Sequence, residues 1–138
     1  MKSYAAQVHI GRVAQMEDTD LPMALITVRY RLRGPVAQFR GDVSPAADAL
    51  AGTPGLIWKI WGFDEAQGMG VSAYLFESLA KAEDFVAGPT IGRLRQRPEV
   101  VEVALELAAV DRDLSARTGA ASALELLPAA ARRLTAAA

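Results

Sequence analysis

The chain has 138 residues, of which 51% are hydrophobic and 22% are charged, and this composition is typical of one folded domain. Its formal net charge of -1 argues against a general electrostatic attraction to nucleic acid or to an anionic membrane. Cysteine is absent and His9 is the only histidine, which excludes disulfides, thiolate chemistry and a multi-histidine metal site.

The termini give no sign of export or of membrane insertion. Lys2 is followed by a mixed polar segment, without the apolar stretch of a secretory signal. No apolar run approaches the roughly 20 residues that a membrane-spanning helix needs. We therefore expect a cytoplasmic protein with no membrane partner.

We expect residues 1–138 to form a single domain, with its core in residues 23–112 and extensions at 1–22 and 113–138. Within the N-terminal extension, residues 4–13 alternate weakly and predict an edge strand. The C-terminal extension is rich in alanine and is predicted to be helical, with an interruption at Pro128.

The first half of the core contains a strand and a helix. Apolar residues alternate over residues 24–32, and this pattern predicts a strand that ends at Gly34-Pro35. Ser44-Pro45 then supplies an N-cap and a proline at the first helical position. The helix that follows is predicted to end at Gly52.

Two further strands form a predicted hairpin. Residues 55–61 and 71–76 are rich in Ile, Val and aromatic side chains, as is typical of strands. Gly68-Met69-Gly70 lies between them and predicts a long, mobile loop. Ser78 then predicts the start of a second helix, which ends at Gly88-Pro89.

The last strand is predicted over residues 100–109, where the pattern alternates again. Val101, Val103, Leu105 and Leu107 are expected on one face, and Glu102, Ala104 and Glu106 on the other. The element order is therefore strand, helix, strand, strand, helix, strand. It predicts an α+β, ferredoxin-like βαββαβ fold, with an antiparallel sheet ordered 4-1-3-2 and both helices on one face.

The opposite face of this sheet is expected to be open in a monomer. It would hold Thr27, Arg29, Glu102 and Glu106, and cross-strand Arg–Glu pairs can form there. An open face that is both polar and aromatic indicates a pocket or an interface.

The two tryptophans, Trp58 and Trp61, are three residues apart on one strand and should point to opposite faces. We predict that Trp61 lines a pocket, together with Lys59 and Ile57. We place that pocket on the side of Arg29 and Glu102, because a lysine is easier to accept there than beneath the helices. The alternative is that both tryptophans belong to the core or to a subunit interface.

Other side chains have a chemical and a structural interpretation. The hydroxyl of Tyr74 could orient a phenolic substrate or donate to an oxyanion, or it could be a buried hydroxyl with one hydrogen bond. Lys59, Arg29, Glu102 and Glu106 could bind or deprotonate a phenol, or they could form a structural ion-pair network.

Two basic features receive no site role. His9 has the natural pKa of a general base, but a lone histidine without a positioned partner is more often a surface residue. The run Arg93-x-Arg95-x-Arg97 is interpreted as a solvated loop after the second helix.

Three segments resemble a known family. PGLIWKIW, the GxGVSAYLFES continuation and VVEVALELAAVDRDLS resemble the YdhR-like putative monooxygenases of the dimeric α+β barrel superfamily. The resemblance covers roughly residues 24–115. It implies a homodimer that pairs its open sheet faces into a barrel, with a cavity between sheet and helices in each subunit.

The wider superfamily includes cofactor-independent monooxygenases that act on aromatic quinols and anthrones. The resemblance therefore implies a cofactor-independent monooxygenase of a small phenolic substrate, with Trp61, Tyr74, Lys59, Arg29 and Trp58 as candidate binding residues. No cofactor is expected, because Gly68-Met69-Gly70 lies in a hairpin rather than at the strand-to-helix turn of a dinucleotide site. No metal is expected, because the chain has no cysteine and only one histidine. The alternatives are a non-oxidative cyclase or isomerase, and a non-catalytic homodimer that binds small molecules. The sequence assigns no catalytic residue.

Overall fold

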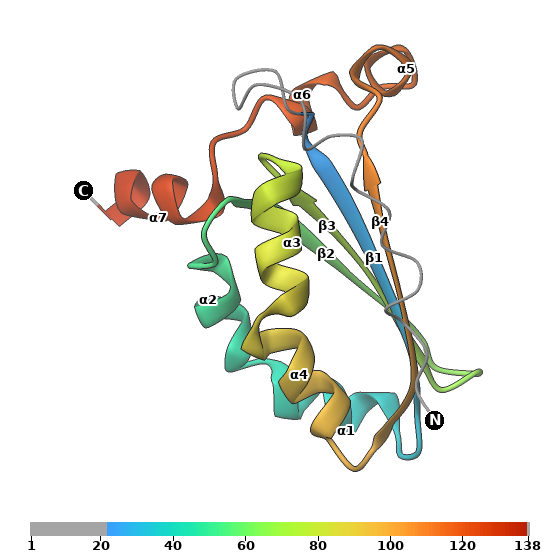
Figure 1. Ribbon diagram of the computed structural model, residues 1–138. Coiled ribbons are helices and arrows are strands. Elements are labelled where there is room, and N and C mark those ends of the chain that lie inside the picture. The colour runs from blue at the N-terminus through green and yellow to red at the C-terminus, as the bar shows by residue number, and fades with distance from the viewer. Residues whose placement is uncertain (1–21, 138) are drawn as a thin grey trace.

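Four strands form one antiparallel sheet in the computed structural model, which describes residues 22–137 (Figure 1). They are β1 (Ala24–Leu32), β2 (Leu56–Asp64), β3 (Met69–Phe76) and β4 (Val100–Ala109). Their order across the sheet is β2-β3-β1-β4, which is the predicted 4-1-3-2 order in reverse. The α+β, ferredoxin-like prediction is therefore confirmed.

Four helices cover one face of this sheet (Figure 1). α1 (Val36–Val43) and α2 (Ala46–Ala51) connect β1 to β2, and α3 (Leu79–Ala87) and α4 (Pro89–Gln96) connect β3 to β4. The sequence patterns predicted α2 and α3 but missed α1 and α4. Both missed helices begin beside a proline that was interpreted as the end of an element. Pro35 is the N-cap of α1, and Pro89 is at the first position of α4, where proline costs no hydrogen bond.

The two predicted serine caps have different outcomes. Ser78 caps α3 as predicted, since its hydroxyl accepts a hydrogen bond from the backbone N–H of Lys81 at 3.2 Å. Ser44 makes no such bond, and Pro45 is the N-cap of α2. Instead, the N–H of Ser44 donates to the carbonyl of Arg40 at 3.1 Å and closes the end of α1.

A short turn joins β2 to β3, so the prediction of a long loop is wrong. Both strands extend beyond their predicted ends and leave only Glu65–Gly68 between them. Gly68 has a φ of +63°, a conformation that glycine adopts without strain. Gly70 belongs to β3, opposite Tyr30, and a Cβ at this position would overlap the Tyr30 ring.

The predicted faces of β4 are wrong at the start of the strand, because a bulge occurs at Glu102, which has a φ of 54°. The pairing of β1 with β4 shifts between Arg29 and Arg31. As a result Val101 pairs with Arg31, on the face away from the helices, while Val100 is buried with Val103. Glu102 does form a cross-strand ion pair, but with Arg31 at 3.2 Å rather than with Arg29. Both side chains are at least half exposed, so the pair contributes little to stability.

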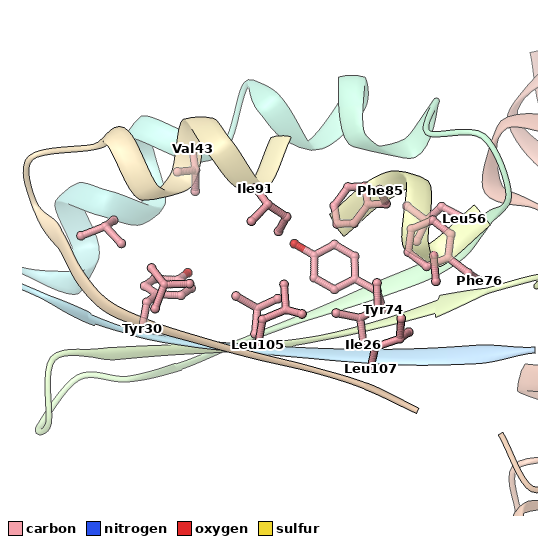
Figure 2. Close-up of a cluster of buried hydrophobic side chains, with 14 of the residues drawn as sticks. Ile26, Tyr30, Val43, Leu56, Tyr74, Phe76, Phe85, Ile91, Leu105 and Leu107 are labelled. Atoms are coloured by element: carbon pink, nitrogen blue, oxygen red, sulfur yellow. The ribbon is translucent and has the colours of Figure 1, made fainter. Parts of the chain in front are cut away.

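The main core lies between the sheet and these helices. Figure 2 shows Ile26, Tyr74 and Leu105 rising from three strands toward Ile91 and Phe85 of the helices. The rings of Tyr74 and Phe85 are 5.0 Å apart, which is a favourable aromatic contact.

The C-terminal segment packs partly on the other face of the sheet and partly beside its edge strand β2, where Arg133 pairs with Asp48 of α2 at 3.2 Å. It contains α5 (Arg112–Arg117), α6 (Ala121–Leu124) and α7 (Ala129–Ala137), with Pro128 between the last two as predicted. Leu124 joins a small cluster with Ile57 and Leu75. Arg132 donates to the carbonyl of Ile57 at 2.9 Å. One end of the face opposite the helices is thus covered by the chain itself.

None of the described helices is both long and apolar enough to cross a membrane. The edge strand predicted over residues 4–13, and His9 within it, lie outside the described residues.

Candidate functional site

A cavity of about 180 Å³ lies between the helix-covered face of the sheet and the helices. Strands β1, β2 and β3 form its floor, and α1, α2 and α4 form its walls. Its lining consists of Val28, Tyr30, Phe39, Val43, Ala46, Ala49, Leu50, Thr53, Lys59, Trp61, Ser72, Tyr74, Thr90, Ile91, Arg93, Leu94 and Arg97. The walls are mostly apolar, with a few polar groups, as is typical of small-molecule sites.

The pairing of β2 with β3 brings four of these residues together. Lys59 is opposite Tyr74, and Trp61 is opposite Ser72. Because side chains alternate along a strand, all four point to the same face of the sheet. Ser72 is only 3% exposed and is the one buried polar residue among those described.

Lys59 is held against two aromatic rings. Its Nζ atom is 3.2 Å from the centroid of the Trp61 ring and 4.7 Å from that of Tyr74. It forms no hydrogen bond or ion pair with any residue in the described part of the chain. Burial in these surroundings lowers the pKa of Lys59 from 10.5 to about 7. The ring faces attract the cation and oppose this shift, but burial is the larger effect.

Two tyrosines in the cavity stay protonated at neutral pH. Burial raises the pKa of Tyr74 well above its usual value, and the nearby Tyr30 adds to this effect. Burial also raises the pKa of Tyr30 to about 12, although the charge of Arg97 works in the opposite direction. Figure 2 shows the Tyr74 hydroxyl pointing toward Ile91 of α4, so it is a potential hydrogen-bond donor inside the cavity.

Two arginines line the cavity from the side of α4. Arg93 lies in the last turn of this helix, and Arg97 is its C-cap residue. Arg97 pairs with Glu99 at 3.1 Å and lies 5.6 Å from the centroid of the Phe39 ring. The interpretation of this segment as a solvated loop is therefore wrong, because it is a helix with two of its arginines at the cavity.

The structure brings three of the five predicted binding residues together. Lys59, Trp61 and Tyr74 line the cavity, whereas Trp58 and Arg29 lie on the opposite face. Trp58 donates its indole N–H to the carbonyl of Ala123 at 3.2 Å, which is a packing role.

The resemblance implied a cavity between the sheet and the helices, and the cavity lies there, but the position predicted from the residues alone is wrong. Lys59 lies beneath the helices and not on the side of Arg29. Ile57 does not share its face, because an irregularity between Leu56 and Trp58 turns it toward Leu75. The aromatic rings beside the Lys59 amine attract its cationic form and so offset part of the cost of burying it beneath the helices.

Sequence reasoning missed Tyr30, Arg93 and Arg97. Tyr30 alternates correctly with Ile26 and Val28, and this pattern alone does not separate a cavity wall from solid core. For the arginines a signal was present. Pro89 followed by Ile91 and Leu94 has the spacing of a helix with one apolar side.

The described residues contain no group of three or more His, Asp or Glu side chains that could hold a metal ion. Among the mostly apolar side chains that line the cavity are instead one amine, two guanidinium groups, several hydroxyl groups and aromatic rings. Such groups can bind an aromatic molecule and can exchange protons with it.

The sequence profile of the family described as "Putative mono-oxygenase ydhR" matches residues 25–121. The chain belongs to this family. The match contains the whole sheet except Ala24, and every residue of the cavity lining. A search of curated proteins found no match.

Two solved structures share the fold of this YdhR family member. One is SnoaB, a cofactor-independent oxygenase from Streptomyces nogalater, with a TM-score of 0.54 and 14% identity over 65% of this chain and 94% of that one. The other is a mutant of the same oxygenase, which is similar at a TM-score of 0.53 and 14% identity, over 64% of this chain and 93% of that one. At this identity the likeness establishes the α+β fold.

Proposed function

We propose that this protein is a cofactor-independent monooxygenase that oxidises a small phenolic substrate, either quinol-like or anthrone-like, in the cavity beneath the helices. The observation that carries the proposal is the Lys59 amine, held in a mostly apolar cavity against Trp61 and Tyr74. Membership of the YdhR family and the fold shared with an oxygenase support it.

Lys59 is the proposed general base. With a pKa of about 7, a large fraction of the amine is neutral at neutral pH and can accept a proton. The proton comes from the substrate, either from a phenolic hydroxyl or from the CH₂ group of an anthrone. Tyr74 remains protonated and can donate a hydrogen bond to the substrate oxygen as negative charge develops there.

The substrate itself supplies the electrons that reduce O₂. For an anthrone, deprotonation gives a carbanion stabilised by the rings, and this carbanion forms a C–O bond with O₂. The peroxide that results loses water, so that a CH₂ group and O₂ become a C=O group and H₂O. Lys59 takes up the first proton and can return it to the departing oxygen, which leaves the amine neutral for the next cycle.

The size of the cavity favours a small substrate. Its volume of about 180 Å³ lies below the roughly 300–1,000 Å³ of sites for drug-sized ligands. A molecule of one or two rings is therefore a better fit than an extended polycycle, unless the helices that form the walls move apart.

We also propose that the protein is a homodimer through the face opposite the helices. Ile60 and Val71 are 59% and 47% exposed there, on neighbouring strands. An open sheet face with exposed β-branched residues is a typical dimer surface.

Oxygen uptake tests the proposed reaction. Metal-free protein is incubated with a panel of one-ring and two-ring quinols and with anthrone, and O₂ consumption is followed with an electrode. We expect consumption above the spontaneous rate for at least one compound, with one H₂O formed per O₂ when the substrate is an anthrone. No uptake above background across the panel would reject the monooxygenase. Turnover of a substrate under argon would instead favour a cyclase or isomerase.

A further inference from the structure

The charged side chains that line the cavity are all basic. Its lining contains Lys59, Arg93 and Arg97 and no aspartate or glutamate. Glu99 neutralises part of the charge of Arg97, but it accepts one hydrogen bond from a guanidinium group that has five N–H donors. Arg93 forms no ion pair with any residue in the described range.

The helix dipole explains why α4 ends in basic residues, but it does not explain why two of them line the cavity. Cations near the C-terminus of a helix interact favourably with its dipole, and Arg93, Arg95 and Arg97 all benefit in this way. However, positions four apart lie on the same side of a helix, where like charges repel. Arg93 and Arg97 have this spacing, and both line the cavity, whereas Arg95 does not.

The chemistry differs between the floor and the wall of the cavity. On the floor, Lys59 lies over the rings of Trp61 and Tyr74, so this region suits an aromatic ring with a phenolic group. At the α4 wall, Arg93 is exposed, and guanidinium groups bind carboxylates through paired hydrogen bonds.

We propose that the cavity selects an aromatic acid, with its phenolic end beside Lys59, Trp61 and Tyr74 and its carboxylate bound by Arg93 and Arg97. This inference rests on the proposed function in that it takes the same cavity as the substrate site. The anionic group anchors the substrate at the α4 wall and leaves the phenol free to react at the floor.

A matched pair of ligands tests this selection. Para-hydroxybenzoate has a phenol and a carboxylate at opposite ends of one ring, and its methyl ester has a similar shape without the charge. Binding of both is measured by titration calorimetry under argon at neutral pH, so that no oxidation takes place. We expect the acid to bind at least about tenfold more tightly than the ester, and high salt to reduce this difference.

Arg93→Gln is the main variant, and Arg40→Gln is its matched control. Arg40 is exposed on α1 and does not line the cavity, but its substitution removes the same charge. We expect Arg93→Gln to weaken binding of the acid by about fivefold or more and to leave the ester unaffected, and Arg40→Gln to change neither. Arg97→Gln should have a similar effect to Arg93→Gln if its melting temperature shows that it folds.

Equal binding of acid and ester, binding of neither, or equal effects of Arg93→Gln and Arg40→Gln would each overturn the inference. Its failure can be told apart from failure of the proposed function. Charge-dependent binding without O₂ consumption would reject only the monooxygenase, and O₂ consumption with charge-independent binding would reject only the selection of an acid.

Discussion

The two faces of the sheet have different chemistry although the same strands build both. β2 contributes Lys59 and Trp61 to the cavity beneath the helices, and Trp58 and Ile60 to the opposite face. In the first pair, the amine of Lys59 lies against the ring of Trp61. The second pair contains a tryptophan that packs on the C-terminal segment and an isoleucine that is 59% exposed. We conclude that one strand supplies both the candidate reaction site and the candidate dimer surface.

The difference between the faces explains why only Trp61, and not Trp58, can line the cavity. Strand alternation separates Trp58 from Trp61, and the indole N–H of Trp58 is already used by the carbonyl of Ala123. Substitutions on the helix-covered face should therefore change catalysis, while substitutions on the opposite face should change assembly.

The largest expected effect comes from Lys59→Met, which removes the proposed base and keeps most of the length of the side chain. We expect the rate of O₂ uptake to fall at least about 100-fold, in the range usual for loss of a general base. The melting temperature should not fall, because the variant no longer buries an amine. Lys81→Met is the matched control, since Lys81 lies on α3 outside the cavity. Equal rates for the two variants would remove Lys59 from the mechanism.

Gly70→Ala tests how tightly the floor of the cavity is packed. A Cβ at Gly70 would overlap the ring of Tyr30, so the strand or the ring must move. We expect a loss of about 1–3 kcal/mol in the free energy of unfolding, as is typical of overpacking. Urea denaturation measures it, with Gly41→Ala as a control at a glycine that has open space around it. A loss no greater than that of the control would show that Tyr30 has room to move.

The buried Lys59 amine on the helix-covered face should make the free energy of unfolding depend on pH. Between pH 7 and pH 10.5 the unfolded chain keeps a proton on Lys59 that the folded protein has released. Stability should therefore rise with pH across this window, by up to about 1.4 kcal/mol per pH unit. Urea denaturation at several pH values would show a flatter profile for Lys59→Met than for the wild type. Identical profiles would mean that burial does not shift this amine.

Ile60→Glu tests the opposite face. The substitution places a charge among the exposed apolar residues of β2 and β3, and we expect the proposed dimer to weaken at least about tenfold. Light scattering during size exclusion gives the mass. Leu114→Glu is the matched control, because Leu114 is 55% exposed and lies on α5, which follows the end of β4 rather than forming part of the sheet (Figure 1). A wild-type protein that is monomeric at micromolar concentration would reject the dimer itself.

Much of the fold could be predicted because its signals are local. Alternation in residues 24–32 and the serine at position 78 depend only on nearby residues, and both were interpreted correctly. Pro35 and Pro89 were misleading, since a proline that ends one element can begin the next. The bulge at Glu102 arises from the pairing of β4 with β1, and alternation within one strand cannot reveal it.

The candidate site was predictable in part. Strand geometry grouped Lys59 with Trp61, and the register of β2 and β3 then added Tyr74. The resemblance implied a cavity beneath the helices, but the residues alone placed Lys59 on the opposite face, because the aromatic rings that accept its amine come together only in the folded sheet. Arg93 and Arg97 join the site through α4, a helix that the sequence interpretation lacked.

The ionisation of Lys59 decides whether its amine can act as the base in the cavity. The chain has only three lysines, Lys2, Lys59 and Lys81, so NMR of protein labelled with ¹³C at the lysine Cε gives three signals. Lys59→Met identifies the one of interest. We expect this signal to titrate near pH 7, well below the ordinary lysine pKa of about 10.4. Titration of the Lys59 signal above pH 10 would contradict the claim that the cavity holds a neutral amine.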